Sequence, residues 1–433
     1  MKPSNGSSTL ALTSNVVQKY APYILLEKIK VIHHFFCIRA GAILLFGFFL
    51  VIHGTGVSQA KFLDQRNAKV RPRGRIACYA SATLRTNFID PENLGPHGYR
   101  FNWSEKNGIA YTCRAGHVDV AHVRKNVDWT AYLAAKTLEK LGKNETAFSF
   151  KLREPSLYFV QLAYPENWKD LSQADRENIA YDISIRLGQY LAYTATTWHE
   201  ILTWYGYKTI AFYPEFPSAF SWEDTFSNVL GIRIGAMALR DAEHGFNEAV
   251  TLALDRELEK LGVQPRVTAI RAAQKVRGLW FSTALLFCVD IMGRNFDIGL
   301  DDGFVTPWII PSVSGCEGTG VQTYPVPNLE FLSEHGFSMR LEIEPREWEK
   351  NKILKAVYPN AKERKKRIEP IVHFAPIMDR IKAEAAKKYG YDVASYHSGM
   401  VAAGDLNGDG KTDFEDFVFL TSRWLEDSND FCP

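Results

Sequence analysis

The sequence contains one long helical pattern, SQADRENIAYDISIRLGQYLAYTATTWHEILTWYG, from Ser172 to Gly206. The Ser172 side chain can cap the first turn, and Gly206 is suited to the turn that ends a helix. At 433 residues, with 46% hydrophobic and 23% charged residues, the chain has the composition of an ordinary globular protein. It is also long enough to bury a large core. We therefore expect a long helix within a large globular fold.

Shorter helical and strand-like patterns flank this helix on both sides. Further helices are predicted at residues 119–141, 221–241, 247–262, 266–276, 345–357 and 374–390. Strands are predicted at residues 76–81, 109–113, 146–164 (a hairpin), 278–283, 294–300, 305–311 and 339–345. These patterns predict one α+β domain over residues 76–395, mostly helical with a smaller strand-rich part, after a polar linker at 61–75.

Residues 1–60 have the features of an export signal. The apolar run GAILLFGFFLVI at 41–52 follows Arg39, and VSQA at 57–60 places small residues before a cleavage site at Lys61. The run is short for a membrane span. Because the stretch before it is longer than a normal n-region, a start at Val31 and an uncleaved anchor stay open as alternatives. We expect a periplasmic or extracellular protein, membrane-anchored if the signal is retained.

Removal of residues 1–60 changes the charge of the chain. The full chain has 51 basic and 49 acidic residues, of which this segment holds five and one, so 46 basic and 48 acidic residues remain. This balance does not indicate nucleic acid as a partner, and KERKKR at 362–367 is typical of a solvated helix face. The five remaining cysteines allow at most two disulfides in an oxidising compartment, with the pairing open: Cys78, Cys113, Cys288, Cys316 and Cys432.

The segment GDLNGDGKTDFEDF, at 404–417, has the pattern of a calcium loop. Oxygen-bearing side chains recur at alternate positions, Gly410 permits the sharp turn, and an amphipathic helix is predicted after the loop. Lys411 would contribute its backbone carbonyl. The predicted calcium ligands are Asp405, Asn407, Asp409, Lys411, Asp413 and Asp416.

Residues 404–425 resemble one repeat of a type I dockerin, in which an EF-hand-like calcium loop and the following helix form an F-hand. The resemblance rests on the loop, on Asp416 at the last loop position and on the exiting helix. It implies calcium as a cofactor and a cohesin-like or envelope partner. Dockerins carry two such repeats and this chain has one, so it stays open whether the tail binds a partner.

Two groups of histidines and carboxylates in the body are candidates for chemistry. His117, Asp119 and His122 lie in GHVDVAHVRK, and two imidazoles with a carboxylate are a set that binds zinc or iron. His199 and Glu200 lie in TWHEILTWYG. This is not the H-E-x-x-H signature of zincin proteases, so His199 is a candidate ligand or base and Glu200 a candidate general acid or base.

A third group, in FSWEDTFSNVLG, opens a helix. Glu223, Asp224 and Asn228 are polar, but acidic residues in a first turn also stabilise the helix dipole without any chemistry. For the first two groups, the competing explanation is helix capping and buried histidines with hydrogen-bond partners. Cys113 lies close to His117 in sequence, which also allows a Cys–His nucleophile.

Four segments of the body resemble the motif blocks of an uncharacterised bacterial domain family found in exported proteins. They are AGHVDVAHVRKNVDWTAYL, TWHEILTWYGYK, FSWEDTFSNVLG and NFDIGLDDGFVTPWIIP. The resemblance covers residues 74–345 and implies no known activity or catalytic residue.

The leading hypothesis is an exported hydrolase with a histidine–carboxylate site, with zinc or iron as a candidate metal. Dockerins accompany enzymes that act on polysaccharide, which makes a glycan the substrate by association. Glycoside hydrolysis needs two carboxyl groups, and Glu200 with Glu223 or Asp224 is the predicted pair. The alternative is a non-catalytic envelope or surface binding protein with a calcium-ordered attachment tail.

Overall fold

The computed structural model describes residues 62–63, 67–83, 86–208, 215–285 and 288–389, together with Phe414 and Val418. The chain divides into two units, Met1–Ser58 and Gln59–Pro433, and all described residues belong to the second. The predicted signal peptide lies outside the described residues. So do all six predicted calcium ligands.

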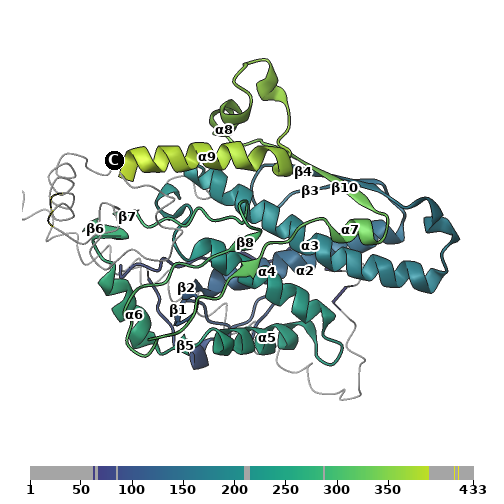
Figure 1. The fold of residues 1–433 in the computed structure, drawn as a ribbon. Coiled ribbons are helices and arrows are strands. Elements are labelled where there is room, and N and C mark those ends of the chain that lie inside the picture. The colour runs from purple at the N-terminus through teal and green to yellow at the C-terminus, as the bar shows by residue number, and fades with distance from the viewer. Residues whose placement is uncertain are drawn as a thin grey trace, which may run out of the picture. The chain divides into compact units, whose positions relative to one another are not determined.

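Three helices form the centre of the fold: α2 (Val120–Gly142), α3 (Gln173–Trp204) and α4 (Asp224–Arg240) (Figure 1). Each packs against the other two. Asp119 caps α2, and the Ser172 hydroxyl accepts a hydrogen bond from the Asp175 N–H at the start of α3. The long helix predicted between Ser172 and Gly206 is confirmed. It could be predicted because its cap and its terminal glycine are both local signals in the sequence.

The other helices lie around this centre. They are α5 (Phe246–Lys260), α6 (Arg266–Lys275), α7 (Phe331–Glu334), α8 (Lys350–Val357) and α9 (Pro370–Tyr389). Short 3₁₀ turns occur at η1 (Asn67–Lys69), η2 (Pro91–Asn93), η3 (Glu166–Asp170), η4 (Phe216–Ser218) and η5 (Glu363–Lys365). Among the described residues, no helix is long and apolar enough to cross a bilayer.

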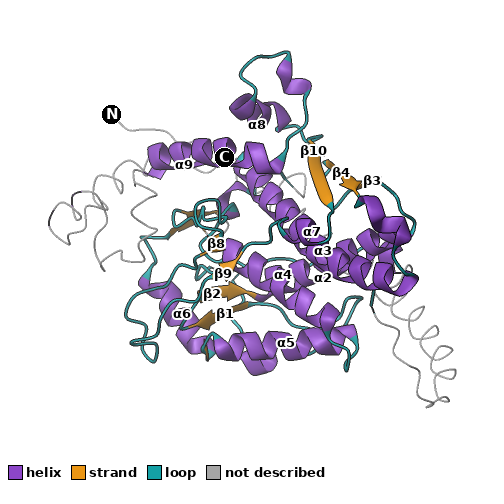
Figure 2. Cartoon of the chain, turned by 45° about the vertical axis from the view of Figure 1, so that its right-hand side comes forward, coloured by secondary structure: helices purple, strands orange, loops and turns teal. Residues whose placement is uncertain are grey.

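The strands form small antiparallel sheets beside the helices (Figure 2). One sheet has the order β2-β1-β5, from Gly116–Asp119, Ile109–Thr112 and Val263–Gln264. A second has the order β10-β4-β3, from Ser338–Glu344, Leu157–Ala163 and Ala147–Phe150. Two-stranded pairs join β6 (Phe281–Leu285) to β7 (Cys288–Ile291) and β8 (Phe304–Val305) to β9 (Tyr324–Pro325). The predicted mostly helical α+β body is therefore confirmed.

Three of the predicted strands are wrong. Residues 76–81 run without a strand partner because their backbone binds side chains instead: the Cys78 N–H donates to Asp119 and the Ala80 N–H to Glu223. Residues 294–300 and 305–311 are mostly loop, apart from the short β8. Four of their apolar residues are nevertheless buried in the core: Phe296, Ile298, Val305 and Ile310.

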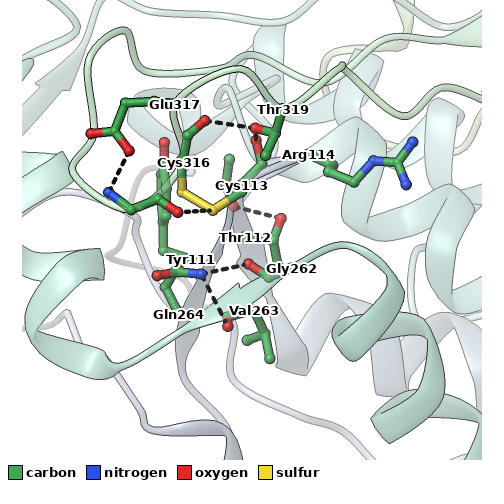
Figure 3. The surroundings of a disulfide bond; sticks show 12 residues. Tyr111, Thr112, Cys113, Arg114, Gly262, Val263, Gln264, Cys316, Glu317 and Thr319 are labelled. Atoms are coloured by element: carbon green, nitrogen blue, oxygen red, sulfur yellow. Dashed lines mark hydrogen bonds between the residues drawn. A yellow bond between two sulfur atoms is a disulfide. The ribbon is translucent and has the colours of Figure 1, made fainter.

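A disulfide joins Cys113, after β1, to Cys316 in the loop before β9 (Figure 3). The Cys113 N–H donates to Gly262 O and the Thr319 hydroxyl contacts Cys113 O, so the bridge ties three chain segments together. This resolves one of the pairings that the sequence left open. It also rules out Cys113 as a free nucleophile, because its sulfur is bonded to another sulfur.

Arg75, at the end of the predicted linker, is buried against the helical centre. Its guanidinium forms ion pairs with Glu105, at 2.8 Å, and with Asp128 of α2. Burial raises the pKa of Glu105, but the hydrogen bonds and charge of Arg75 outweigh this and lower it to about 2. The chain just before residues 76–81 is therefore held in place before it reaches Asp119 and Glu223.

Candidate functional site

Five ionisable side chains gather where the ends of α2, α3 and α4 meet. Asp119 and His122 come from the start of α2, Glu200 from the last turns of α3, and Glu223 and Asp224 from the start of α4. All five are buried, with exposed fractions between 0% and 7%. We call these residues the carboxyl cluster. Burying four carboxyl groups together costs free energy, which makes the cluster a candidate for function.

Asp119 serves two purposes at once. Its Oδ1 accepts hydrogen bonds from the Ala121 and His122 N–H groups and so caps α2. Its Oδ2 accepts the Cys78 N–H at 2.8 Å and lies 3.4 Å from His122 Nδ1. Burial raises the pKa of Asp119, while the nearby imidazolium works in the opposite direction. The capping role therefore accounts for only one of its two oxygens.

His122 is the cation of the cluster. Its Nδ1 lies 2.8 Å from Asp224 Oδ1 and 3.4 Å from Asp119 Oδ2. Burial alone would lower the pKa of His122, but the charges of Asp224 and Asp119 outweigh it and raise the pKa to about 9. At neutral pH the ring is therefore an imidazolium held between two carboxyl groups.

Glu200 and Glu223 favour the protonated form. Burial raises the pKa of Glu200, and the negative charge of Asp224 raises it further. The same two causes raise the pKa of Glu223 well above its ordinary value. Glu200 Oε2 accepts the Phe220 N–H at 2.9 Å, and Glu223 Oε1 accepts the Ala80 N–H at 3.0 Å. Glu223 Oε2 is buried without a hydrogen-bond partner among the described residues.

The turn that carries Glu223 and Asp224 is strained. Phe220 has a φ of 55°, a left-handed conformation that bulky residues rarely adopt, and it is fully buried. Arg294 supports this turn by donating to Phe216 O and Ala219 O, and the Asn295 N–H donates to Phe220 O. Strain of this kind persists where surrounding structure enforces it, and it concentrates at functional sites.

A buried chain of polar side chains links the three helices beside the cluster. The Thr196 hydroxyl of α3 donates to Asn126 Oδ1 of α2, at 2.6 Å. The Asn126 amide donates to Asn228 Oδ1 of α4, also at 2.6 Å. Such a satisfied network fixes how the helices are aligned along their axes. It holds His122, Glu200 and Asp224 in one arrangement.

The four sequence segments that resemble family motif blocks converge on this place. The first carries Asp119 and His122, the second Glu200, the third Phe220 to Asp224, and the fourth Asn295. Residues 85–300 match the model of a family described as "Protein of unknown function (DUF4056)". This segment is a DUF4056 domain. No curated protein and no solved structure matches the chain.

The DUF4056 domain contains the whole carboxyl cluster, and the expected uncharacterised family is confirmed for this part of the chain. The match starts at residue 85, so Cys78 and Ala80, whose N–H groups bind the cluster, lie just before it. It ends at residue 300, before the disulfide partner Cys316 and before the tail.

His117 does not join the other candidates of the DUF4056 domain. Its Nε2 lies 2.9 Å from Ala269 O, and its ring contacts Phe88, Tyr111 and Trp222. Burial lowers the pKa of His117 to about 4, so the ring is neutral. This matches the competing explanation from the sequence, a core histidine with a hydrogen-bond partner.

His199 has its own carboxylate partners. Its Nδ1 lies 2.9 Å from Glu154 Oε1, and its Nε2 lies 4.0 Å from Glu215 Oε2. Burial would raise the pKa of Glu154, but the hydrogen bond and charge of His199 lower it to about 2. The sequence did not single out Glu154, because a lone glutamate in the turn of a hairpin carries no recognisable pattern.

The residues proposed for zinc or iron in the DUF4056 domain do not converge. His117 binds a backbone carbonyl, His122 pairs with Asp224, and His199 pairs with Glu154. Within the described part of the chain, no three His, Cys, Asp or Glu side chains are arranged to hold a metal ion. Burial and the nearby Asp119 raise the pKa of the Cys78 thiol to about 12.

Proposed function

We propose that the DUF4056 domain is the catalytic body of an exported hydrolase, with Asp224 as general base and Glu200 as general acid. One observation carries the proposal: Asp224 is ion-paired with a protonated His122, while burial and the charge of Asp224 raise the pKa of Glu200. Hydrolysis at neutral pH requires an acid that can give a proton and a base that can accept one.

The proposed roles follow from the contacts of each residue. Asp224 removes a proton from a water molecule that attacks the scissile bond, and Glu200 gives its proton to the leaving group. His122 and Asp119 are positioning residues, which hold Asp224 through the 2.8 Å ion pair. The Phe220 N–H, which binds Glu200 Oε2, fixes the carboxyl group of the acid.

The carboxyl pair also supports a substrate class. Hydrolysis of glycosidic bonds uses two carboxyl groups, and it needs no metal to activate water. A glycan is therefore the proposed substrate, in agreement with the dockerin-like tail at residues 404–425. The proposed role of the tail is to bind calcium and attach the enzyme to a cohesin-like or envelope partner.

Export is supported by two independent features. The apolar run at 41–52 and the small residues at 57–60 form a signal peptide pattern. The Cys113–Cys316 disulfide suits an oxidising compartment such as the periplasm or the extracellular space. The proposed location is therefore outside the cytoplasm, with a membrane anchor if residues 1–60 are retained.

A non-catalytic binding protein is the second candidate. The observation that favours it is the burial of the carboxyl cluster, since Glu200, Glu223 and Asp224 expose 5% or less of their surfaces. In that case the cluster only stabilises one arrangement of the three central helices. The hydrolase and the binding protein predict different results for isosteric substitutions in the carboxyl cluster. Such substitutions should slow hydrolysis by an enzyme, whereas a binding protein has no hydrolysis to lose.

The deciding experiment is an activity screen of residues 61–433 against polysaccharides, esters and peptides, followed by kinetics of Glu200→Gln and Asp224→Asn. Each substitution keeps the shape of the side chain and removes its acid–base function. We expect kcat to fall by roughly 10²–10⁴-fold in each. Glu166→Gln, at an exposed position in η3, is the matched control and should leave kcat unchanged.

Thermal unfolding of all three variants shows whether the fold is retained. Wild-type kcat in both cluster variants, on a substrate that the wild type hydrolyses, contradicts the proposed roles. Binding of a glycan by the wild type without turnover of any substrate favours the binding protein instead.

A further inference from the structure

A cavity of about 510 Å³ lies outside the DUF4056 domain, between the end of β10, α8 and the η5 turn. Figure 1 shows α8 above α9, away from α2 and α4, which lie below α9 in this view. None of the residues of the carboxyl cluster lines it. We call it the basic cavity. Its lining residues are Glu344, Pro345, Arg346, Lys350, Asn351, Leu354, Ala361, Arg364 and Lys366.

The charges around the basic cavity are unbalanced. Among the described residues that line it, four are cationic and one is acidic. The acidic one, Glu344, is already engaged: Arg346 Nε donates to it at 2.7 Å, and Arg367 Nε lies 3.8 Å away. The cationic side chains around the basic cavity repel one another, and a bound anion would reduce that repulsion.

Arg364 provides a second, independent observation. Its Nε is buried and has no hydrogen-bond partner among the described residues, and its guanidinium makes only a long contact, of 3.5 Å, with Pro359 O. A buried donor without an acceptor is costly in a native protein, and an unseen ion is one of its ordinary explanations. An anion in the basic cavity would provide the missing acceptor.

An exposed aromatic side chain lies close in sequence to the residues that line the cavity. Trp348 lies in sequence between the lining residues Arg346 and Lys350, and 98% of its surface is exposed. Tryptophan is enriched where a protein meets the headgroup region of a membrane. Leu354, Pro345 and Ala361 add apolar surface to the cationic lining.

We propose that the basic cavity binds a phosphate group that carries more than one negative charge or is presented at an anionic surface. Two arginines and two lysines in about 510 Å³ call for concentrated negative charge, and phosphate oxygens suit both guanidinium and ammonium donors. The phosphate comes either from a soluble phosphorylated compound or from the headgroup of an anionic phospholipid. The site is independent of the proposed hydrolase activity.

The test uses residues 61–433 and two probes. Calorimetry with sodium pyrophosphate measures binding of a soluble phosphate compound. Co-sedimentation with phosphatidylcholine vesicles, with and without phosphatidylglycerol, measures binding to an anionic phospholipid surface. We expect binding at low ionic strength that weakens as salt is added. Lys350→Glu/Lys366→Glu should lower the affinity by about tenfold or more, and Lys350→Gln/Lys366→Gln by less.

The matched control is Lys169→Glu/Arg271→Glu, which makes the same change of charge at exposed positions in η3 and α6. It should bind as the wild type does. Binding of pyrophosphate alone identifies a soluble ligand. Binding of phosphatidylglycerol vesicles that Trp348→Phe weakens identifies a membrane. The proposal is overturned if the wild type binds neither probe, or if the control loses as much affinity as the cavity variants.

Discussion

At the scale of single residues, burial and a neighbouring charge decide which carboxyl groups keep their protons. Glu200 and Glu223 both lie beside Asp224 and away from water, so the pKa of each is raised. The Glu105 side chain is also buried, yet two hydrogen bonds from Arg75 lower its pKa to about 2. The same residue type therefore has a raised pKa in one place and a lowered pKa in another.

The stability of the protein should depend on His122 over a defined pH range. The folded-state pKa is about 9 and the ordinary value is 6.5, so its stabilising contribution is complete below pH 6.5 and lost as the pH rises through 9. We expect His122→Gln to lower the free energy of unfolding more at pH 6 than above pH 9. By the size of the pKa difference, the two losses should differ by about 3 kcal/mol.

Urea unfolding of His122→Gln and the wild type at several pH values measures this difference. His335→Gln, at the C-cap of the short helix α7, is the control for removing a histidine outside the carboxyl cluster. A loss for His122→Gln that is constant across the range would show that the imidazolium is not stabilised by its carboxylate neighbours.

At the scale of elements, the close approach of α2 and α4 positions the carboxyl cluster. A Cβ added at Gly231 of α4 would lie 2.2 Å from Val123 O of α2, so only glycine fits at this crossing. One turn before Gly231, Asn228 binds Asn126 of α2. The contact at Gly231 and the ion pair between His122 and Asp224 therefore depend on the same helix crossing.

Gly231→Ala should destabilise the protein by roughly 1–3 kcal/mol, because the added methyl group forces the two helices apart. Gly142→Ala is the matched control, since a Cβ there meets no atom within 4 Å at the end of α2. It should leave stability unchanged or raise it by up to about 1 kcal/mol. Thermal unfolding compares the two, and equal stability in both variants would contradict the tight crossing.

At the scale of the whole molecule, contacts far apart in sequence join the strand-rich part to the helical centre. The disulfide closes a loop between residues separated by 203 positions. Tyr111, two residues before Cys113, contributes to a core shared with Trp222 and Ile310. Covalent closure of so long a loop restricts the unfolded chain strongly.

Cys113→Ser/Cys316→Ser should therefore lower the free energy of unfolding by about 2–5 kcal/mol, measured by denaturant titration without reductant. Adding reductant should lower the stability of the wild type toward that of the double variant. Cys78→Ser is a control that leaves the bridge intact. A wild type that is insensitive to reductant would argue against the bridge.

Calcium binding by residues 404–425 is a prediction from the sequence pattern. Residues 61–433 should bind one calcium ion per chain by calorimetry, because one loop supplies the oxygen ligands. Asp405→Ala/Asp409→Ala should abolish this binding, while Asp170→Ala, at an exposed position in η3, should not change it. Calcium binding that survives the double substitution would place the site elsewhere.

The sequence by itself determined the helices, because a cap such as Ser172, an ending such as Gly206 and apolar spacing are local properties of the chain. It also singled out Asp119, His122, Glu200, Glu223 and Asp224 as candidates from polar residues at helix ends. Residues 76–81 show where local information fails. Their alternation suggests a strand, but their N–H groups bind Asp119 and Glu223 instead of a neighbouring strand.

Only the tertiary structure decided which candidates lie together. It separated His117 from His122, although they are five residues apart, because one ring lies among Phe88, Tyr111 and Trp222 and the other pairs with Asp224. It also joined His199 to Glu154, a residue without any sequence signal. The physical reason is that burial and partner charge set protonation, and both depend on chain segments that meet only when the helices pack.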